Sequence, residues 1–199
     1  MTKIKLCGMM RPSDVTTAVS LGADYVGFVL TEGFRRSVGA GELHMMLDCI
    51  ADSAVKRVGV FVDEPIENII KNYADMLDMI QLHGSEDESY IRDLKELAGK
   101  PVIKSFTVVS NTDIEAAEQC CADLVLLDSG KGTGRVFDHS LIKGISRPYF
   151  LAGGLNAENV GEAIASLHPF AVDASSGIET EGFKDKTKMT AFVNAVRKG

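Results

Sequence analysis

Two residues at the ends of predicted strands have side chains that can move protons. Cys7 ends an apolar run that begins at residue 4, and Asp128 ends the run that begins at Leu124. One group of such a pair can remove a proton while the other donates one. A cysteine acts as a base when cationic or phosphate-binding surroundings favour its thiolate. Taken singly, Cys7 also fits a small buried apolar residue, and Asp128 fits a cap for the following turn.

Two turns rich in small residues, at 152–156 and 173–179, follow two other short apolar runs. Glycine and serine let backbone N–H groups come close to a ligand, and aligned N–H groups favour an anion. Because only one predicted helix separates the two turns, we expect them to hold one phosphate group between neighbouring strand ends. The candidate residues in these turns are Gly153, Gly154, Asp173, Ser175 and Ser176.

Two further predicted strands are followed by side chains that can bind a substrate: arginines after one strand and a histidine after the other. Arg35 and Arg36 lie after the second predicted strand, and either could hold a carboxylate bidentately, with a solvated surface pair as the alternative. His83, in the string QLHG, is expected to hydrogen-bond to a substrate or to neighbouring loops. No second His or Cys lies at ligand-like spacing from His83, so the sequence predicts no metal site.

The elements that must position these residues alternate regularly. Short apolar runs separated by amphipathic stretches are typical of βα units and a parallel sheet. The predicted strands cover residues 4–7, 25–30, 57–62, 79–82, 102–106, 124–128, 149–152 and 170–173. The predicted helices cover residues 13–21, 41–51, 65–74, 85–98, 112–120, 138–143, 156–167 and 184–197.

Eight even units without a long crossover favour closure into a compact (β/α)₈ TIM barrel over an open doubly wound sheet. No linker or low-complexity segment divides the chain, so residues 1–199 are expected to form one domain. Two helix starts show the spacing of a capping box, Ser85 with Glu88 and Thr112 with Glu115.

The glycine-rich loop at 129–137 carries two cations. It has neither the ending of a P-loop nor the position of a dinucleotide fingerprint. We interpret this loop as a lid beside an anionic substrate, with a plain flexible connection as the alternative.

Composition narrows the classes of partner and compartment. A net charge of −7 argues against nucleic acid as a main partner. No run reaches the roughly 18 apolar residues of a membrane helix, and the start of the chain does not resemble a signal peptide. The four cysteines show no CxxC spacing, which predicts neither zinc nor disulfides and favours the cytoplasm. The sequence leaves monomer and homodimer open.

The strings at the strand ends together resemble one family over the whole chain. They are KLCG at 5–8, VGFV at 26–29, RVGVFV at 57–62, QLHG at 81–84, LLD at 126–128, GTGRVFD at 132–138, LAGGLN at 151–156 and VDASSGIE at 172–179. In this order they resemble phosphoribosylanthranilate isomerase, a (β/α)₈ enzyme of tryptophan biosynthesis.

The resemblance implies an Amadori rearrangement of N-(5-phosphoribosyl)anthranilate, a phosphosugar, without a metal or organic cofactor. It assigns the general base to Cys7 and the general acid to Asp128. It implies that the arginine corresponding to Arg36 binds the anthranilate carboxylate. It also implies that the phosphate is bound by Gly153, Gly154, Ser175 and Ser176, and that Asp173 hydrogen-bonds to a sugar hydroxyl.

The chain departs from the family pattern after the second strand. The family usually has a Ser-Pro-Arg-like turn there, whereas this chain reads GFRRS at 33–37, so Arg35 and Arg36 both stay candidates. Two other functions share a phosphate site. A phosphosugar epimerase would need clustered metal ligands, and an indole-glycerol-phosphate-type lyase would need lysine at the mouth, where only Lys104 is placed. A binding module without catalysis would need neither Cys7 nor Asp128.

Overall fold

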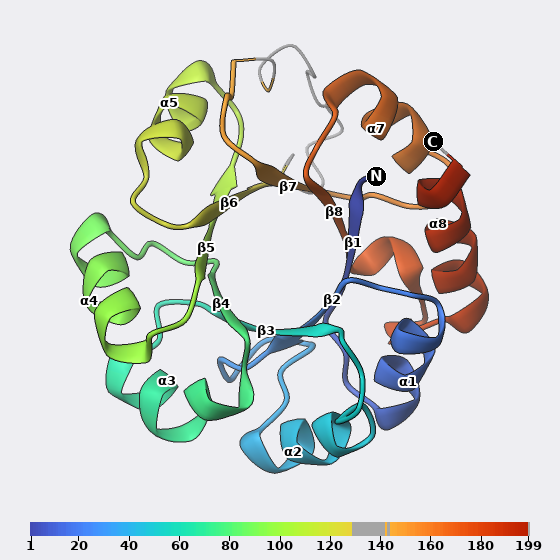
Figure 1. Cartoon of the computed structure of the whole chain (residues 1–199), viewed down its shortest axis with the longest axis horizontal. Coiled ribbons are helices and arrows are strands. Elements are labelled where there is room, and N and C mark those ends of the chain that lie inside the picture. The colour runs from blue at the N-terminus through green and yellow to red at the C-terminus, as the bar shows by residue number, and fades with distance from the viewer. Residues whose placement is uncertain (129–141, 143, 199) are drawn as a thin grey trace.

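The computed structural model describes residues 1–128, 142 and 144–198. Eight parallel strands close into a barrel in chain order, each paired with the next and β8 paired with β1. Figure 1 looks down this barrel and shows the strands as a central ring surrounded by helices. The strands are β1 (Lys3–Cys7), β2 (Tyr25–Val29), β3 (Lys56–Phe61), β4 (Met79–Leu82), β5 (Val102–Thr107), β6 (Leu124–Asp128), β7 (Tyr149–Ala152) and β8 (Ala171–Ala174).

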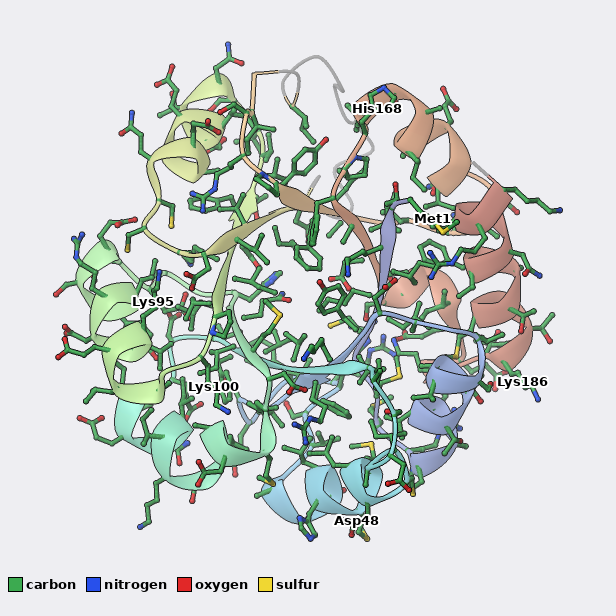
Figure 2. The ribbon with its side chains drawn as sticks, viewed as in Figure 1. Met1, Asp48, Lys95, Lys100, His168 and Lys186 are labelled. Atoms are coloured by element: carbon green, nitrogen blue, oxygen red, sulfur yellow. The ribbon has the colours of Figure 1, made fainter. Side chains whose placement is uncertain are left out.

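The helices lie outside the ring, and the polar ends of their side chains point to solvent. Figure 2 shows Asp48 and Lys186 at the periphery of the molecule. The α-helices are α1 (Pro12–Ser20), α2 (Ala40–Asp48), α3 (Ile66–Asn72), α4 (Glu88–Ala98), α5 (Asn111–Gln119), α7 (Val160–Leu167) and α8 (Lys186–Lys198). The 3₁₀ turns are η1 (Ala74–Met76) and η2 (Ser176–Ile178). The predicted lid at 129–137 and most of the predicted helix at 138–143 lie outside the described residues.

Two apolar cores support the barrel, one between strands and helices and one inside the ring. Alternation along each strand sends successive side chains to opposite sides, so both faces of every strand must be buried. This requirement explains why the strands read as nearly continuous apolar runs. The interior core consists of Tyr25, Val58, Met79, Ile103, Leu126, Phe150, Ala152 and Ala171.

A short antiparallel pair, which the sequence did not predict, follows η2. It consists of β9 (Glu179–Thr180) and β10 (Phe183–Lys184). The pair lies between β8 and α8 and carries Glu179 and Lys184, both buried. Within the described part of the chain, no helix has the length and apolarity needed to cross a membrane.

Both predicted capping boxes are wrong. Helix α4 begins at Glu88, and Asp87 caps it by accepting a hydrogen bond from the Tyr90 amide. Ser85 instead donates from its amide and its hydroxyl to Asp63, 22 residues earlier.

Helix α5 begins one residue before the predicted Thr112, and its box joins Ser110 to Asp113. The predicted helix at 156–167 begins only at Val160. The side chain of Asn156 accepts hydrogen bonds from the backbone amides of Glu158 and Asn159 in a turn that precedes the helix.

Candidate active site

The two predicted acid–base residues end two strands of the same barrel. Cys7 is the last residue of β1 and is 7% exposed, and Asp128 is the last residue of β6. Lys5 and Leu126, two residues earlier on the same strands, are buried inside the ring. Because side chains alternate, Cys7 and Asp128 also face the interior. Both therefore lie at the carboxyl-terminal mouth, where (β/α)₈ enzymes carry their active sites.

His83 lies at the same mouth, directly after β4. Partial removal from water lowers the pKa of this imidazole, although the residue keeps exposed surface; Asp128 and Asp173 act in the opposite direction, whereas Lys5 adds to the lowering. His83 is therefore neutral near pH 7 and suited to hydrogen bonding. Its Nδ1 lies 3.4 Å from Nε2 of Gln81. The charges that act on His83 come from β1, β5, β6 and β8, which places its ring among the groups predicted for catalysis.

The turn after β1 brings Arg36 next to one of the predicted phosphate turns. Gly8 has a φ of 76°, and a Cβ on it would lie 2.5 Å from Cδ of Arg36 and 3.1 Å from Oγ of Ser175. Only glycine fits this conformation and this close approach without strain. Cys7, Arg36 and Ser175 are thus gathered on one side of the mouth.

The two predicted phosphate turns contact each other. Gly153 and Gly154 follow β7 with φ values of 102° and 65°, a backbone conformation that favours glycine. A Cβ on Gly177, in η2 after β8, would collide with the backbone carbonyl of Leu155. The structure therefore brings Gly153 and Gly154 together with Ser175 and Ser176 at neighbouring strand ends, as the sequence predicts.

Glu179 gathers three cations beside this mouth. Arg36 donates to it bidentately, from Nε to Oε1 at 2.6 Å and from Nη2 to Oε2 at 2.9 Å. Nη2 of Arg35 lies 2.6 Å from Oε2, and Nζ of Lys184 lies 2.7 Å from Oε1. The side chain of Arg36 is 16% exposed, against 54% for Arg35. Arg36 is therefore the arginine held at the mouth, and Arg35 extends further toward solvent.

A family model described as N-(5'phosphoribosyl)anthranilate isomerase matches residues 4–195. The chain belongs to this isomerase family. An N-(5'-phosphoribosyl)anthranilate isomerase of Endomicrobium trichonymphae is 40% identical over 203 residues, covering 99% of both chains.

Solved structures of the isomerase family have the same architecture. The phosphoribosyl anthranilate isomerase of Thermus thermophilus superposes with a TM-score of 0.88 at 32% identity and covers 99% of each chain. A phosphoribosyl anthranilate isomerase in complex with reduced 1-(o-carboxyphenylamino)-1-deoxyribulose 5-phosphate superposes with a TM-score of 0.87 at 34% identity and covers both chains fully. These comparisons confirm the predicted family and the predicted barrel.

A buried ion pair of this isomerase-family chain was not predicted from the sequence. Nζ of Lys5, in β1, donates to Oδ1 of Asp173, in β8, at 3.0 Å, and the Lys5 side chain is fully buried. The two residues are register partners in neighbouring strands. A lysine inside a short apolar run was the available signal, but its partner, 168 positions away, becomes apparent only when the barrel closes.

Other polar residues near the strand ends have structural partners. Lys104 donates to Glu86 at 2.8 Å and to the carbonyl of Gly84 at 2.7 Å. Asp63 accepts two hydrogen bonds from Ser85, which lower the pKa of its carboxyl group. Among the residues that the structure describes, no three His, Cys, Asp or Glu side chains group as metal ligands.

Replacement of Glu179 by glutamine tests the ionic cluster through stability. Burial disfavours the charge of Glu179, but hydrogen bonds from Arg36, Lys184 and Arg35 outweigh it and lower the pKa to about 2. A depressed pKa stabilises the fold above the ordinary carboxyl pKa, and this contribution is lost as the pH falls toward 2. We expect E179Q to lower the free energy of unfolding at pH 7 by on the order of 2 kcal/mol, allowing for solvent screening at Arg35.

Urea unfolding of both proteins between pH 7 and pH 3 checks this expectation, because the difference between them must shrink as the pH falls. Exposed Glu181, two residues away, provides the control, and E181Q is expected to change stability by less than about 0.5 kcal/mol. A difference that stays constant with pH would show that the charge of Glu179 does not stabilise the fold.

Proposed function

We propose that this protein isomerises N-(5-phosphoribosyl)anthranilate to 1-(2-carboxyphenylamino)-1-deoxyribulose 5-phosphate in tryptophan biosynthesis. Cys7 is the general base and Asp128 the general acid of this reaction. The observation that carries the proposal is that both residues face one barrel mouth, beside two contacting small-residue turns, in a chain of this family. We also propose that residues 1–199 act as one domain.

The chemistry needs an acid and a base at different atoms of the sugar. The acid Asp128 protonates the furanose ring oxygen, and the bond from that oxygen to C1′ breaks to give an open-chain iminium ion. The thiolate of Cys7 then removes the proton from C2′, and the electron pair moves into the iminium group to give an enolamine. Tautomerisation places a proton on C1′ and leaves a ketone at C2′. The substrate's own iminium group accepts the electrons, so the proposal invokes no cofactor.

The remaining residues hold the two ends of the substrate. The amides of Gly153 and Gly154 and the turn at Ser175 and Ser176 bind the phosphate. Arg36 binds the anthranilate carboxylate; two of its five N–H donors contact Glu179, and others face the substrate. Neutral His83 hydrogen-bonds to the substrate. Asp173, although paired with Lys5, has a second carboxylate oxygen for a sugar hydroxyl.

Mixing the purified protein with freshly prepared phosphoribosylanthranilate tests the function directly. We expect the anthranilate fluorescence to fall at a rate proportional to enzyme concentration, with the deoxyribulose phosphate as product. Turnover of indole-glycerol-phosphate precursors or of a simple phosphosugar, without turnover of this substrate, would overturn the proposal. Lys104, which the lyase alternative would use at the mouth, is paired with Glu86.

Substitution of Gly177 by alanine tests the phosphate site. The added methyl group must push η2 away from Leu155 and so separate the two turns. Because the turns would bind the phosphate jointly, we expect KM to rise about tenfold or more, with a smaller effect on kcat. Steady-state kinetics, with inorganic phosphate as a competitive inhibitor, measures both parameters, and the inhibition constant should rise in parallel with KM.

Gly161 in α7 provides a matched glycine, since a Cβ there meets nothing within 4 Å. We expect G161A to retain the wild-type KM and to gain helix stability of up to about 1 kcal/mol. An unchanged KM in a folded G177A variant would place the phosphate elsewhere.

A further inference from the structure

Lys5 is a fully buried ammonium two residues before the proposed base. Its side chain lies inside the ring on the same face of β1 as Cys7. Removing an ammonium group from water is costly, and a buried ion pair seldom stabilises a fold more than well-packed apolar residues would. The other interior positions of the barrel are mostly apolar. The position of this lysine beside Cys7 therefore calls for an explanation other than stability.

The Lys5 ammonium is charged and interacts with Asp173 and with Cys7. Nζ of Lys5 lies 3.0 Å from Oδ1 of Asp173, and this hydrogen bond uses one of the three N–H donors of the ammonium. Burial acts to lower the pKa of Lys5, but the charge of Asp173, followed by charge and hydrogen-bonding interaction with Cys7, outweighs burial and raises it. Lys5 thus stays protonated across the working pH range.

We propose that Lys5 is a positioning residue that stabilises the thiolate of Cys7, while Asp173 holds the Lys5 ammonium in place. The proton that leaves Cys7 goes to solvent, and Lys5 keeps its own. The thiolate then accepts the C2′ proton of the substrate, so the assignment rests on the function proposed above. Asp173 thereby contributes to the base as well as to substrate binding.

Other charged groups surround Cys7, but their contacts direct them elsewhere. Lys184 is also buried and acts on Cys7, yet Glu179 and the carbonyl and hydroxyl of Ser175 accept from its ammonium at 2.7, 3.0 and 3.3 Å. Arg36 is bidentate with Glu179.

On the far side of the mouth, His83 is neutral, and Asp128, the proposed general acid, supplies no positive charge to a thiolate. Among the described residues, the Lys5 ammonium donates to one oxygen, Oδ1 of Asp173, whereas that of Lys184 donates to three.

A titration of Cys7 without substrate tests the role. The far-ultraviolet absorbance of the thiolate is followed between about pH 5 and pH 10, and the matching Cys7→Ala protein is subtracted to isolate this residue. In Lys5→Met we expect the midpoint to rise by about one pH unit or more, which is at least tenfold less thiolate at any pH below the midpoint. Lys5→Arg keeps the charge and is expected to keep most of the thiolate. The acid limb of kcat/KM should move by the same amount.

Lys5→Met leaves Asp173 buried without its partner, which can prevent folding. The double variant K5M/D173N removes both charges, so it keeps the test available; a smaller rise is expected, because the lost Asp173 carboxylate also opposed the thiolate. Lys104→Met is the control, since it breaks another buried lysine–carboxylate pair, with Glu86, on β5. It is expected to lose stability without moving the Cys7 midpoint.

The two proposals fail in different ways. An unchanged midpoint in Lys5→Met or in the double variant overturns the role of Lys5, even if the wild-type protein is an active isomerase. If the midpoint shifts but the wild-type protein does not turn over phosphoribosylanthranilate, the effect of Lys5 on the Cys7 thiolate stands and the proposed function is overturned. A midpoint that rises equally in Lys104→Met would show a general effect of lost stability and would also overturn the role of Lys5.

Discussion

The Cys7→Ala variant is expected to lose kcat by a factor of about 10³, within the range of 10² to 10⁴ that general acid–base catalysis supplies. Alanine removes only the sulfur from a side chain that is 7% exposed, so the barrel should stay folded. KM should change little, because the proposed contacts with phosphate and carboxylate come from other elements. Steady-state kinetics on substrate protonated or deuterated at C2′ measures the loss and identifies the slow step. Without the base, removal of the C2′ proton limits the rate, and a full isotope effect is expected.

Two other cysteines provide matched controls for this variant. Cys49 is exposed near the end of α2, and Cys121 is half-buried before β6. Alanine at either position should leave kcat within about twofold of the wild-type value, as is usual for substitutions away from a site. A Cys7→Ala protein that keeps more than about a tenth of the wild-type kcat would contradict the role of Cys7 as base.

Local pattern was enough to predict the barrel strands. Each barrel strand is buried on both faces, so its residues form apolar runs that stand out against the amphipathic helices. The barrel follows from counting these runs, because eight even units leave no long crossover. Helix starts were predicted less well because their caps depend on distant residues. Ser85 has the right spacing to Glu88, but in the fold it donates its hydrogen bonds to Asp63 instead of capping the helix.

Site residues were predictable where topology alone positions them. Residues at the carboxyl ends of barrel strands meet at one mouth, which brings Cys7 and Asp128 together without any knowledge of side-chain contacts. The ionic contacts of the mouth could not be derived in this way. Arg36 meets Glu179 across 143 positions of sequence, and the string VDASSGIE shows only that an acidic residue follows the phosphate turn. Register between β1 and β8 is equally invisible in either strand alone.

Glu179 links the carboxylate and phosphate ends of the proposed site. It holds Arg36 at the mouth through two hydrogen bonds and holds Lys184, which in turn donates to the carbonyl of Ser175. A change at either end can therefore be transmitted to the other through three buried or half-buried charges. Substitution at Glu179 should consequently affect substrate binding as well as stability, whereas the acid–base residues should affect the chemical step alone.

The Asp128→Asn variant is expected to lose kcat by a similar factor of about 10³, but for a different step. Asparagine keeps the shape of the side chain and its hydrogen-bonding capacity, yet it supplies no acidic proton to the ring oxygen. Ring opening then becomes rate-limiting, while Cys7 still removes the C2′ proton rapidly afterwards. The deuterium isotope effect at C2′ should therefore disappear in this variant, in contrast to Cys7→Ala.

The contrast between these isotope effects separates the two roles more sharply than the loss of rate does. Exposed Asp48 on α2 provides the control, and D48N is expected to keep both the wild-type kcat and the wild-type isotope effect. A full isotope effect in Asp128→Asn would mean that this residue acts in the proton transfer at C2′ instead of at the ring oxygen. Wild-type turnover in that variant would remove Asp128 from the mechanism altogether. Since the two losses belong to successive steps, the double variant C7A/D128N should be only slightly slower than the slower single variant, because one blocked step already limits the whole reaction.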